Sequence, residues 1–292
     1  MNVAITTREA ESQLLISELD SLVKNIVIPP RPKTLIDLQA EMRKEEPDFR
    51  HVSRMVASDV TLTVAALRIV NSPAYGLRRR CESVDEAISM IGLKQLNTIV
   101  TGLVLRNVLR TDGQQLTRFW DVSAKRAHVM RRMAGEIGQV DVDIAHSFGL
   151  FCDVGIPLLM RRFPDYGGTL KACNDEVTLS FTEVEHAHHQ TDHALLGAMM
   201  ARSWGLSQPL CLAIRLHHDY GIFQDPQVPE LVTRLISMGL VAEIAIQRFA
   251  NLNTSTEWNK GGNQACGALM FNDQDVEDWI ECLLVEFSSG LA

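Results

Sequence analysis

Apolar residues along the chain recur at the spacing of amphipathic helices, and alternating strand patterns are nearly absent. A capping box of Thr6 and Glu9 precedes an apolar stripe over residues 14–23. Three prolines within 29–32 exclude a helix there and predict an extended segment. The pattern over residues 33–110 then predicts four or five short helices, several of which begin at Asp or Ser caps.

The second half of the chain predicts longer helices, after a boundary that we place between residues 111 and 112. A long helix around Phe119 ends near Gly138. The next one, expected to begin at Asp143, is apolar on nearly all sides, which indicates the centre of a bundle, although Pro157 should kink or stop it.

The last third of the chain predicts two more long helices and one loop. The helices are expected around residues 229–250 and 273–288. The stretch 251–267 between them is polar and rich in glycine and asparagine, so we expect a loop there. The two predicted subdomains, 1–111 and 112–292, are therefore both helical.

Charge and cysteine usage narrow the class of protein. The formal charge of −8 disfavours direct binding to nucleic acid or to an anionic membrane surface. None of the six cysteines forms a C-x-x-C pair, and scattered cysteines suit a reducing compartment. The sequence shows no signal-peptide pattern and no apolar run of about 18–20 residues, so we expect a cytoplasmic protein without a membrane span.

Six of the nine histidines lie between His186 and His218, which raises the question of a metal site. His189 and His193 have the spacing of one helical turn, but Asp192 between them is a helix cap, and a cap there would place His189 outside the helix. Asp153 lies within the apolar helix and needs a partner if it is buried, either a metal or a histidine.

Several segments in this order resemble the HDOD family, a bacterial branch related to the HD-superfamily phosphohydrolases. The resemblance covers about residues 20–220. It is carried by IPPRP (28–32), SDVTL (58–62), RIVNSPAYG (68–76), SVDEAISMIGL (83–93), FW (119–120), GLFCDVG (149–155), His193 with Gly197, WGL (204–206), AI (213–214) and HH (217–218). It implies an all-α fold, in which an N-terminal helical bundle packs against a degenerate HD-like helical bundle, and a role in bacterial signalling.

The resemblance also implies which positions would hold metal in a working HD site. Such a site uses a first histidine, a His-Asp pair, further histidines and a late aspartate, and its metal activates water for attack on phosphorus. Here Val122 stands near the first position, Cys152 replaces the histidine of the pair, and Leu240 falls near the late acid. The residues that remain are Asp153, His193, His217 and His218.

The loss of three ligands out of about six predicts that the pocket holds no metal and no other cofactor and has no catalytic residues. Valine cannot ligate, and a buried cysteine among apolar neighbours stays a thiol, which is a poor ligand for a hard metal. We therefore expect a degenerate pocket lined by Val122, Cys152, Asp153, His193, His217 and His218.

The leading hypothesis is a non-catalytic regulatory protein that binds a signalling protein partner, with a small ligand in the pocket as a further option. No receiver or output domain is recognisable in the sequence, so we expect it to act on a separate protein. The alternative is a metal-dependent phosphohydrolase or phosphodiesterase with a non-standard site of Asp153, His193, His217 and His218, with His189 or Cys152 as additional candidates. A third hypothesis is a helical adaptor whose pocket has no function.

Overall fold

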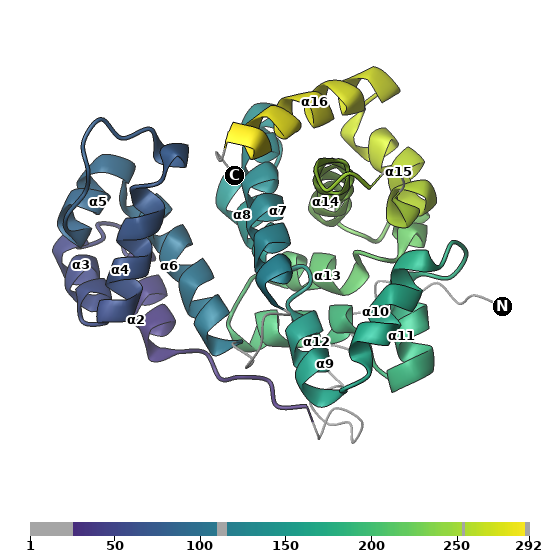
Figure 1. Cartoon of the computed structure of the whole chain (residues 1–292), viewed down its shortest axis with the longest axis horizontal. Helices are drawn as coiled ribbons and strands as arrows, with labels where there is room; N and C mark the ends of the chain where they lie inside the picture. The colour runs from purple at the N-terminus through teal and green to yellow at the C-terminus, as the bar shows by residue number, and fades with distance from the viewer. Residues whose placement is uncertain (1–25, 110–115, 253–254, 290–292) are drawn as a thin grey trace. The chain divides into compact units, whose positions relative to one another are not determined.

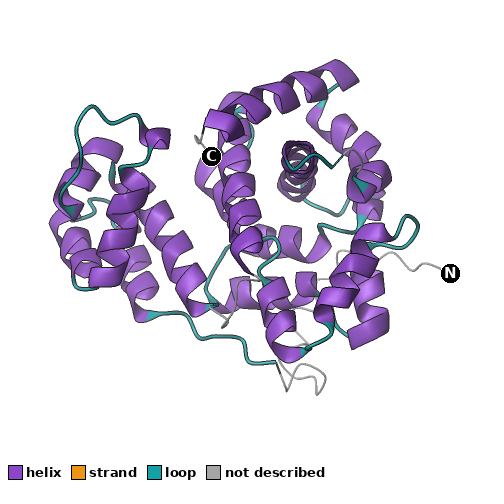
Figure 2. Ribbon diagram, viewed as in Figure 1, coloured by secondary structure: helices purple, strands orange, loops and turns teal. Residues whose placement is uncertain are grey.

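The computed structural model describes residues 26–109, 116–252 and 255–289, and these ranges contain helices and loops but no strand (Figure 2). The predicted all-α fold class is confirmed. The described helices fall into two compact units, one within Pro29–Arg110 and one within Thr111–Phe287. The helix predicted over residues 6–23 lies outside the described residues, and the division of the whole chain at 111/112 stays a prediction.

The smaller unit is built from short helices whose starts follow the predicted caps. Asp48 accepts hydrogen bonds from the backbone N–H groups of Arg50 and His51, and Asp59 accepts one from Leu62. Gly92 ends one helix at a φ of 82°, a conformation that favours glycine. The helices are α2 (Lys33–Met42), α3 (Phe49–Ala57), α4 (Val60–Val70), the 3₁₀ turn η1 (Pro73–Tyr75), α5 (Val84–Ile91) and α6 (Leu93–Val108).

The larger unit contains the remaining described helices (Figure 1). They are α7 (Leu116–Ile137), α8 (Val142–Phe151), α9 (Gly155–Arg162), α10 (Tyr166–Asp175), α11 (Phe181–His189), α12 (His193–Ser203), α13 (Gln208–Leu216), the 3₁₀ turn η2 (Tyr220–Gln224), α14 (Glu230–Phe249), α15 (Thr256–Leu269) and α16 (Asp273–Ser289). Helix α7 packs against α8 and α14, and α12 packs against α9 and α13. Phe148, Phe151 and Trp204 are almost fully buried among them, and the rings of Phe151 and Trp204 meet edge to face.

The central apolar helix differs from its prediction at both its start and its middle. Asp141, not Asp143, caps it, because the Asp141 carboxylate accepts the backbone N–H groups of Asp143 and Ile144. The helix is also interrupted over residues 152–154, between α8 and α9. Pro157 lies in the first turn of α9, where its missing N–H removes no helical hydrogen bond. The break therefore comes before the proline, and it contains Asp153.

The predicted loop over residues 251–267 is wrong over most of its length, because α15 begins at Thr256. Ser255 caps this helix by accepting the backbone N–H of Trp258. A Cβ on Gly261 would lie 2.5 Å from the ring of Tyr220. Glycine ordinarily weakens a helix, but close packing requires it at this position. Helix α15 lies against α14.

The stretch Val142–Arg162 also corrects the expectation that no apolar run has the length of a membrane span. By length and composition it is sufficient, with a mean hydropathy of 1.4 over its most apolar window. The core helix of a folded protein passes the same test, and 56% of that window is buried inside the protein. The burial of Phe148, Phe151 and Leu158 accounts for the apolar composition.

Candidate functional site

The break between α8 and α9 positions Asp153. Gly155, the first residue of α9, packs very closely on the start of α12. A Cβ on Gly155 would lie 2.1 Å from the carbonyl oxygen of His193. Only glycine fits this approach without movement of the backbone. As a result the Asp153 side chain reaches the imidazole of His193, and Asp153 Oδ1 lies 3.7 Å from His193 Nε2.

His193 is the first residue of α12, and a buried carboxylate holds it. Asp192 caps the helix by accepting the backbone N–H of Leu195. Glu185, at the end of α11, accepts hydrogen bonds from the backbone N–H of His193 at 3.0 Å and from its Nδ1 at 2.7 Å. The hydroxyl of Tyr166 also donates to Glu185, so this fully buried carboxylate is satisfied.

His217 and His218 follow the end of α13 and are oriented by different acceptors. His217 donates from Nδ1 to the carbonyl oxygen of Ile214 at 2.7 Å. His218 Nδ1 lies 2.6 Å from Glu257 of α15, which also accepts the hydroxyl of Tyr220 at 2.6 Å. The first turn of α15 thus supplies the partner that fixes the His218 ring.

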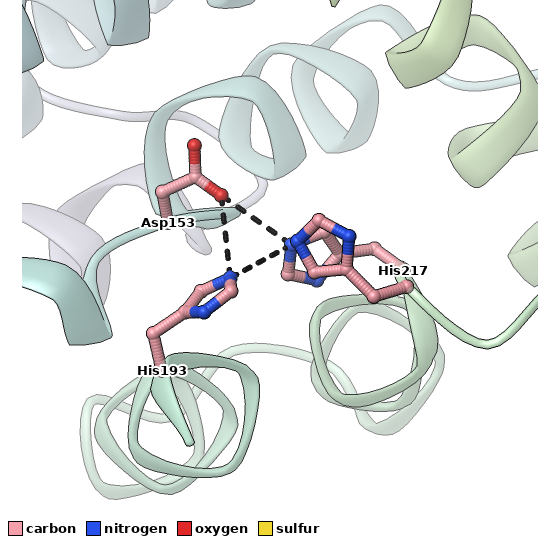
Figure 3. Close-up of side chains that lie close together, drawn as sticks. Asp153, His193 and His217 are labelled. Carbon is pink, nitrogen blue, oxygen red and sulfur yellow. Dashed lines mark hydrogen bonds and ion pairs between the residues drawn. The ribbon is translucent and has the colours of Figure 1, made fainter. Parts of the chain in front are cut away.

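Asp153, His193 and His217 form a triangle of polar atoms (Figure 3). Asp153 Oδ1 lies 3.3 Å from His217 Nε2, and the two Nε2 atoms are 3.1 Å apart. When the ring nitrogens of His218 are included, one potential ligand atom from each of the four residues lies within 4.8 Å of the others. Asp153, His193, His217 and His218, far apart in the sequence, are therefore brought together.

The hydrogen bonds of His193 and His217 require a cation at this triangle. Both Nδ1 atoms donate to groups that accept, so both Nε2 atoms face each other with their lone pairs. Two bare lone pairs repel at 3.1 Å. Either a proton on one Nε2 or another cation must therefore occupy the contact.

The charges around the triangle favour protonated imidazoles. Burial lowers the pKa of His193, but the carboxylates of Glu185 and Asp153 outweigh burial and raise it to about 9. Burial also lowers the pKa of His217, and its contacts with Cys152 and Asp153 raise it to about 9. Burial raises the pKa of Asp153, but the charge of Arg126 and the bond from His217 hold it well below its usual value.

Arg126 of α7 is one of the residues at this site that no sequence pattern indicated. Its Nη1 lies 2.6 Å from Asp153 Oδ2, and its Nη2 lies 2.9 Å from a carboxylate oxygen of Glu243 on α14. The guanidinium is buried and permanently charged. It follows Val122 by four residues on α7, so both side chains line the same cavity, one helical turn apart.

The donor set itself fits a metal ion in part. Oxygen and nitrogen ligands about 2.0–2.2 Å from a zinc ion lie roughly 3–3.5 Å from one another, close to the spacings of the triangle. Hydrogen bonds from Nδ1 to Glu185 and to Ile214 are also the kind that orient metal-binding histidines. The opposing feature is Arg126, whose charge occupies the second oxygen of Asp153.

A cavity of about 740 Å³ opens above these residues. Asp153, Arg126 and three histidines are among its polar lining residues. Val122 and Cys152 lie in its wall at the two positions where the resemblance places metal-binding histidines. Its apolar lining residues include Phe119, Phe148, Ile156, Met160, Leu170, Phe181 and Leu240. The volume and the mixed lining are those of a small-molecule pocket.

The remaining sequence candidates lie elsewhere or differ in detail. His189 ends α11, outside the helix of His193, and its Nε2 lies 2.8 Å from the hydroxyl of Thr169. Leu240 lines the cavity, and the acid on that helix face is Glu243, three residues later. Glu185 and Glu257 also act at the site. The capping box of Ser180 marked the start of the Glu185 helix, but no local pattern distinguished these glutamates from solvent-exposed ones.

Comparison with known proteins agrees with this architecture. A protein of Treponema pallidum (strain Nichols), named only as uncharacterised, is 24% identical over 257 residues. The match covers 87% of this chain and 49% of that protein, so the chain spans about half the length of that relative. A second curated relative, YuxH of Bacillus subtilis (strain 168), matches over 98 residues, 24% of its length.

Two crystal structures have a similar fold. One, provisionally named a phosphohydrolase, from Shewanella amazonensis SB2B, has a TM-score of 0.68 at 22% identity, with 96% of each chain covered. The other, provisionally named a signal transduction protein, from Marinobacter aquaeolei VT8, has a TM-score of 0.72 at 19% identity, covering 99% of this chain and 66% of that one. The family model of the HDOD domain matches residues 28–220. The resemblance seen in the sequence is thereby confirmed, and the chain belongs to the HDOD domain family.

Proposed function

We propose that this protein is a non-catalytic HDOD regulator of bacterial signal transduction, which acts in the cytoplasm by binding a signalling protein. The observation that carries the proposal is the ion pair of Arg126 with Asp153. Asp153 is the acid that remains from the His-Asp pair of a working site, and one of its oxygens is bound to a fixed cation. Val122 and Cys152 in the same cavity wall support the same conclusion.

The argument against a catalytic metal is electrostatic. A divalent ion on Asp153 Oδ1 would lie within a few ångströms of a buried guanidinium, and like charges repel strongly where water is excluded. Arg126 cannot lose its proton to relieve the repulsion. Moving the Arg126 side chain away from the ion would leave Glu243 without its partner. A proton shared between His193 Nε2 and His217 Nε2 satisfies the triangle without that cost.

The cavity supports a further part of the proposal, a small ligand that modulates partner binding. Its lining includes the Arg126 guanidinium and three imidazoles together with aromatic and aliphatic side chains. Such a pocket recognises a small molecule with a polar end and an apolar body. The comparison protein provisionally named for signal transduction is consistent with this role.

A second candidate, a metal-dependent phosphohydrolase, is favoured by the triangle and by a charge count. Four carboxylates surround the site against two cationic side chains: Asp153, Glu185, Glu243 and Glu257 against Arg126 and Lys260. The excess of two negative charges equals the charge of one divalent ion. In this candidate Asp153, His193, His217 and His218 would hold the ion, which would supply activated water for attack on phosphorus.

Metal content and turnover separate the two candidates. The protein is purified without chelators, its Mn, Fe and Zn are quantified, and hydrolysis of bis(p-nitrophenyl) phosphate is assayed with each metal added. We expect metal well below one ion per chain and no turnover above buffer. Stoichiometric metal and turnover that both disappear in Asp153→Ala would establish the phosphohydrolase instead. Arg234→Ala, which removes an arginine paired with the exposed Glu230, is the control for a nonspecific loss.

A further inference from the structure

The charge of the chain is divided unevenly along its length. Residues 29–110 contain 13 lysines and arginines against 9 aspartates and glutamates, a net charge of +4. Residues 111–292 contain 13 against 23, a net charge of −10. The overall charge of −8 therefore conceals a basic small unit, and a basic surface favours acidic partners.

The unpaired part of this charge includes the outward faces of α3 and α4. Helix α3 buries Val52, Ser53 and Val56, and α4 buries Leu62, Ala66 and Val70. The two helices pack together, with the Thr63 hydroxyl donating to the Val56 carbonyl. The side chains that point away from this core include Arg50, Arg54, Val60, Val64 and Arg68, which we call the α3–α4 face.

The three arginines of the α3–α4 face have no carboxylate within ion-pair distance in the part of the chain that the structure describes. The only acid between residues 49 and 70 is Asp59, and its carboxylate caps α4. Asp48, just before, caps α3 in the same way. Lys44, by contrast, pairs with Glu41. The face is therefore a basic surface whose nearby acids are committed to helix caps.

The same face exposes two apolar side chains, one helical turn apart. Val60 is 75% exposed and Val64 is 61% exposed. A single exposed valine is ordinary in a folded protein. Here the two valines continue into Arg68 at the spacing i, i+4, i+8, so one line along α4 offers apolar contact and then a positive charge. This order matches a partner helix that carries apolar residues beside carboxylates.

We propose that the α3–α4 face binds an acidic amphipathic helix of a protein partner. The apolar residues of the partner helix would cover Val60 and Val64. Its carboxylates would pair with Arg50, Arg54 and Arg68. A protein fits this face better than nucleic acid does, because two exposed positions on α4 are apolar and the chain as a whole is acidic. The inference rests on the proposed function for the existence of a protein partner, and it adds where that partner binds and what its surface contains.

Fluorescence anisotropy with the full chain and three labelled probes tests the inference. The probes are a helical peptide of about five turns with leucines at i, i+4 spacing flanked by glutamates, the same peptide with lysine for every glutamate, and a DNA duplex of similar length. We expect the acidic peptide to bind and the other two not to bind. Arg54→Glu with Arg68→Glu, and separately Val60→Asp with Val64→Asp, should each weaken binding about tenfold or more.

Matched controls make the same chemical changes at other exposed positions. Arg106→Glu reverses a charge on α6, and Val285→Asp replaces a valine that is 69% exposed on α16. Neither should weaken binding, and circular dichroism verifies that every variant is folded. The proposal is overturned if the acidic peptide does not bind, if the basic peptide or the duplex binds as well, or if the face variants behave like the controls. None of these results depends on metal content or turnover, so failure here and failure of the proposed function are distinguishable.

Discussion

At the scale of single residues, Arg126 determines the character of the site. Val122, one turn before it, is identifiable in the sequence because the family resemblance places a ligand there. An arginine on a long amphipathic helix ordinarily points to solvent, so its pattern gave no reason to place it inside. Its role is visible only when α7, the α8–α9 break and α14 bring Asp153 and Glu243 to its two nitrogens.

Replacing Arg126 with methionine should destabilise the protein strongly. The change preserves most of the apolar stem but leaves Asp153 and Glu243 without their cation, and breaking a buried ion pair costs about 3–5 kcal/mol. We expect a loss of that order in the free energy of unfolding in urea. Arg248→Met, at the exposed pair with Glu277, should cost less than about 1 kcal/mol. Equal losses in the two variants would show that the Arg126 pair has no special role.

The protonated histidines predict how stability depends on pH. The pKa values of His193 and His217 are about 9 in the folded protein and about 6.5 in the unfolded chain. A raised folded pKa contributes stability that is fully present below pH 6.5 and is lost as the pH rises through 9. The free energy of unfolding should therefore decline from pH 6.5 to above pH 9. In His217→Gln that decline should be shallower, and a flat profile in the wild type would contradict the assignment.

At the scale of elements, the break between α8 and α9 builds the site. The apolar pattern predicted one helix through this region with a fault at Pro157, and it placed Asp153 inside that helix. The structure instead ends α8 at Phe151, which frees the Asp153 backbone to turn toward α12. Hydrophobic periodicity could not locate this break, because the residues on both sides are equally apolar. The cause is a tertiary contact, the approach of Gly155 to the His193 backbone.

Two glycine-to-alanine changes should therefore have opposite effects. Gly155→Ala introduces a Cβ 2.1 Å from a backbone oxygen, so we expect a loss of at least about 2 kcal/mol from forced backbone movement. Gly135→Ala, within α7, meets no atom within 4 Å and should raise stability by about 1 kcal/mol through helix propensity. Thermal unfolding of both variants measures whether each change lowers or raises the stability. If Gly155→Ala leaves the stability unchanged, this contact does not position Asp153.

Helix α15 shows the limit of composition as a guide to elements. Its glycines and asparagines predicted a loop, yet Gly261 and Gly262 lie where Tyr220 and the Trp258 ring leave no space for a Cβ. Missing this helix also concealed Glu257, which orients His218 and Tyr220 from its first turn. Local signals did identify the elements with strong caps, including those at Asp48, Asp59, Ser180 and Asp192.

At the scale of the whole molecule, the sequence was sufficient for the fold class, the family and the gathering of the histidines. Asp153, His193, His217 and His218 could be placed in one pocket because the family resemblance relates their positions. The residues that balance their charge, Arg126, Glu185, Glu243 and Glu257, could not be predicted, since each depends on contacts between different helices. These four decide whether the pocket favours protons or a metal ion.

Anomalous diffraction from a crystal soaked in Mn²⁺ shows whether a divalent ion binds beside Asp153. The Arg126 guanidinium and the proton shared by His193 and His217 should leave no place for one. We predict no anomalous peak between Asp153, His193 and His217 at a manganese concentration that labels an ordinary exposed carboxylate. A peak bonded to all three side chains, with Arg126 turned away from Asp153, would contradict it.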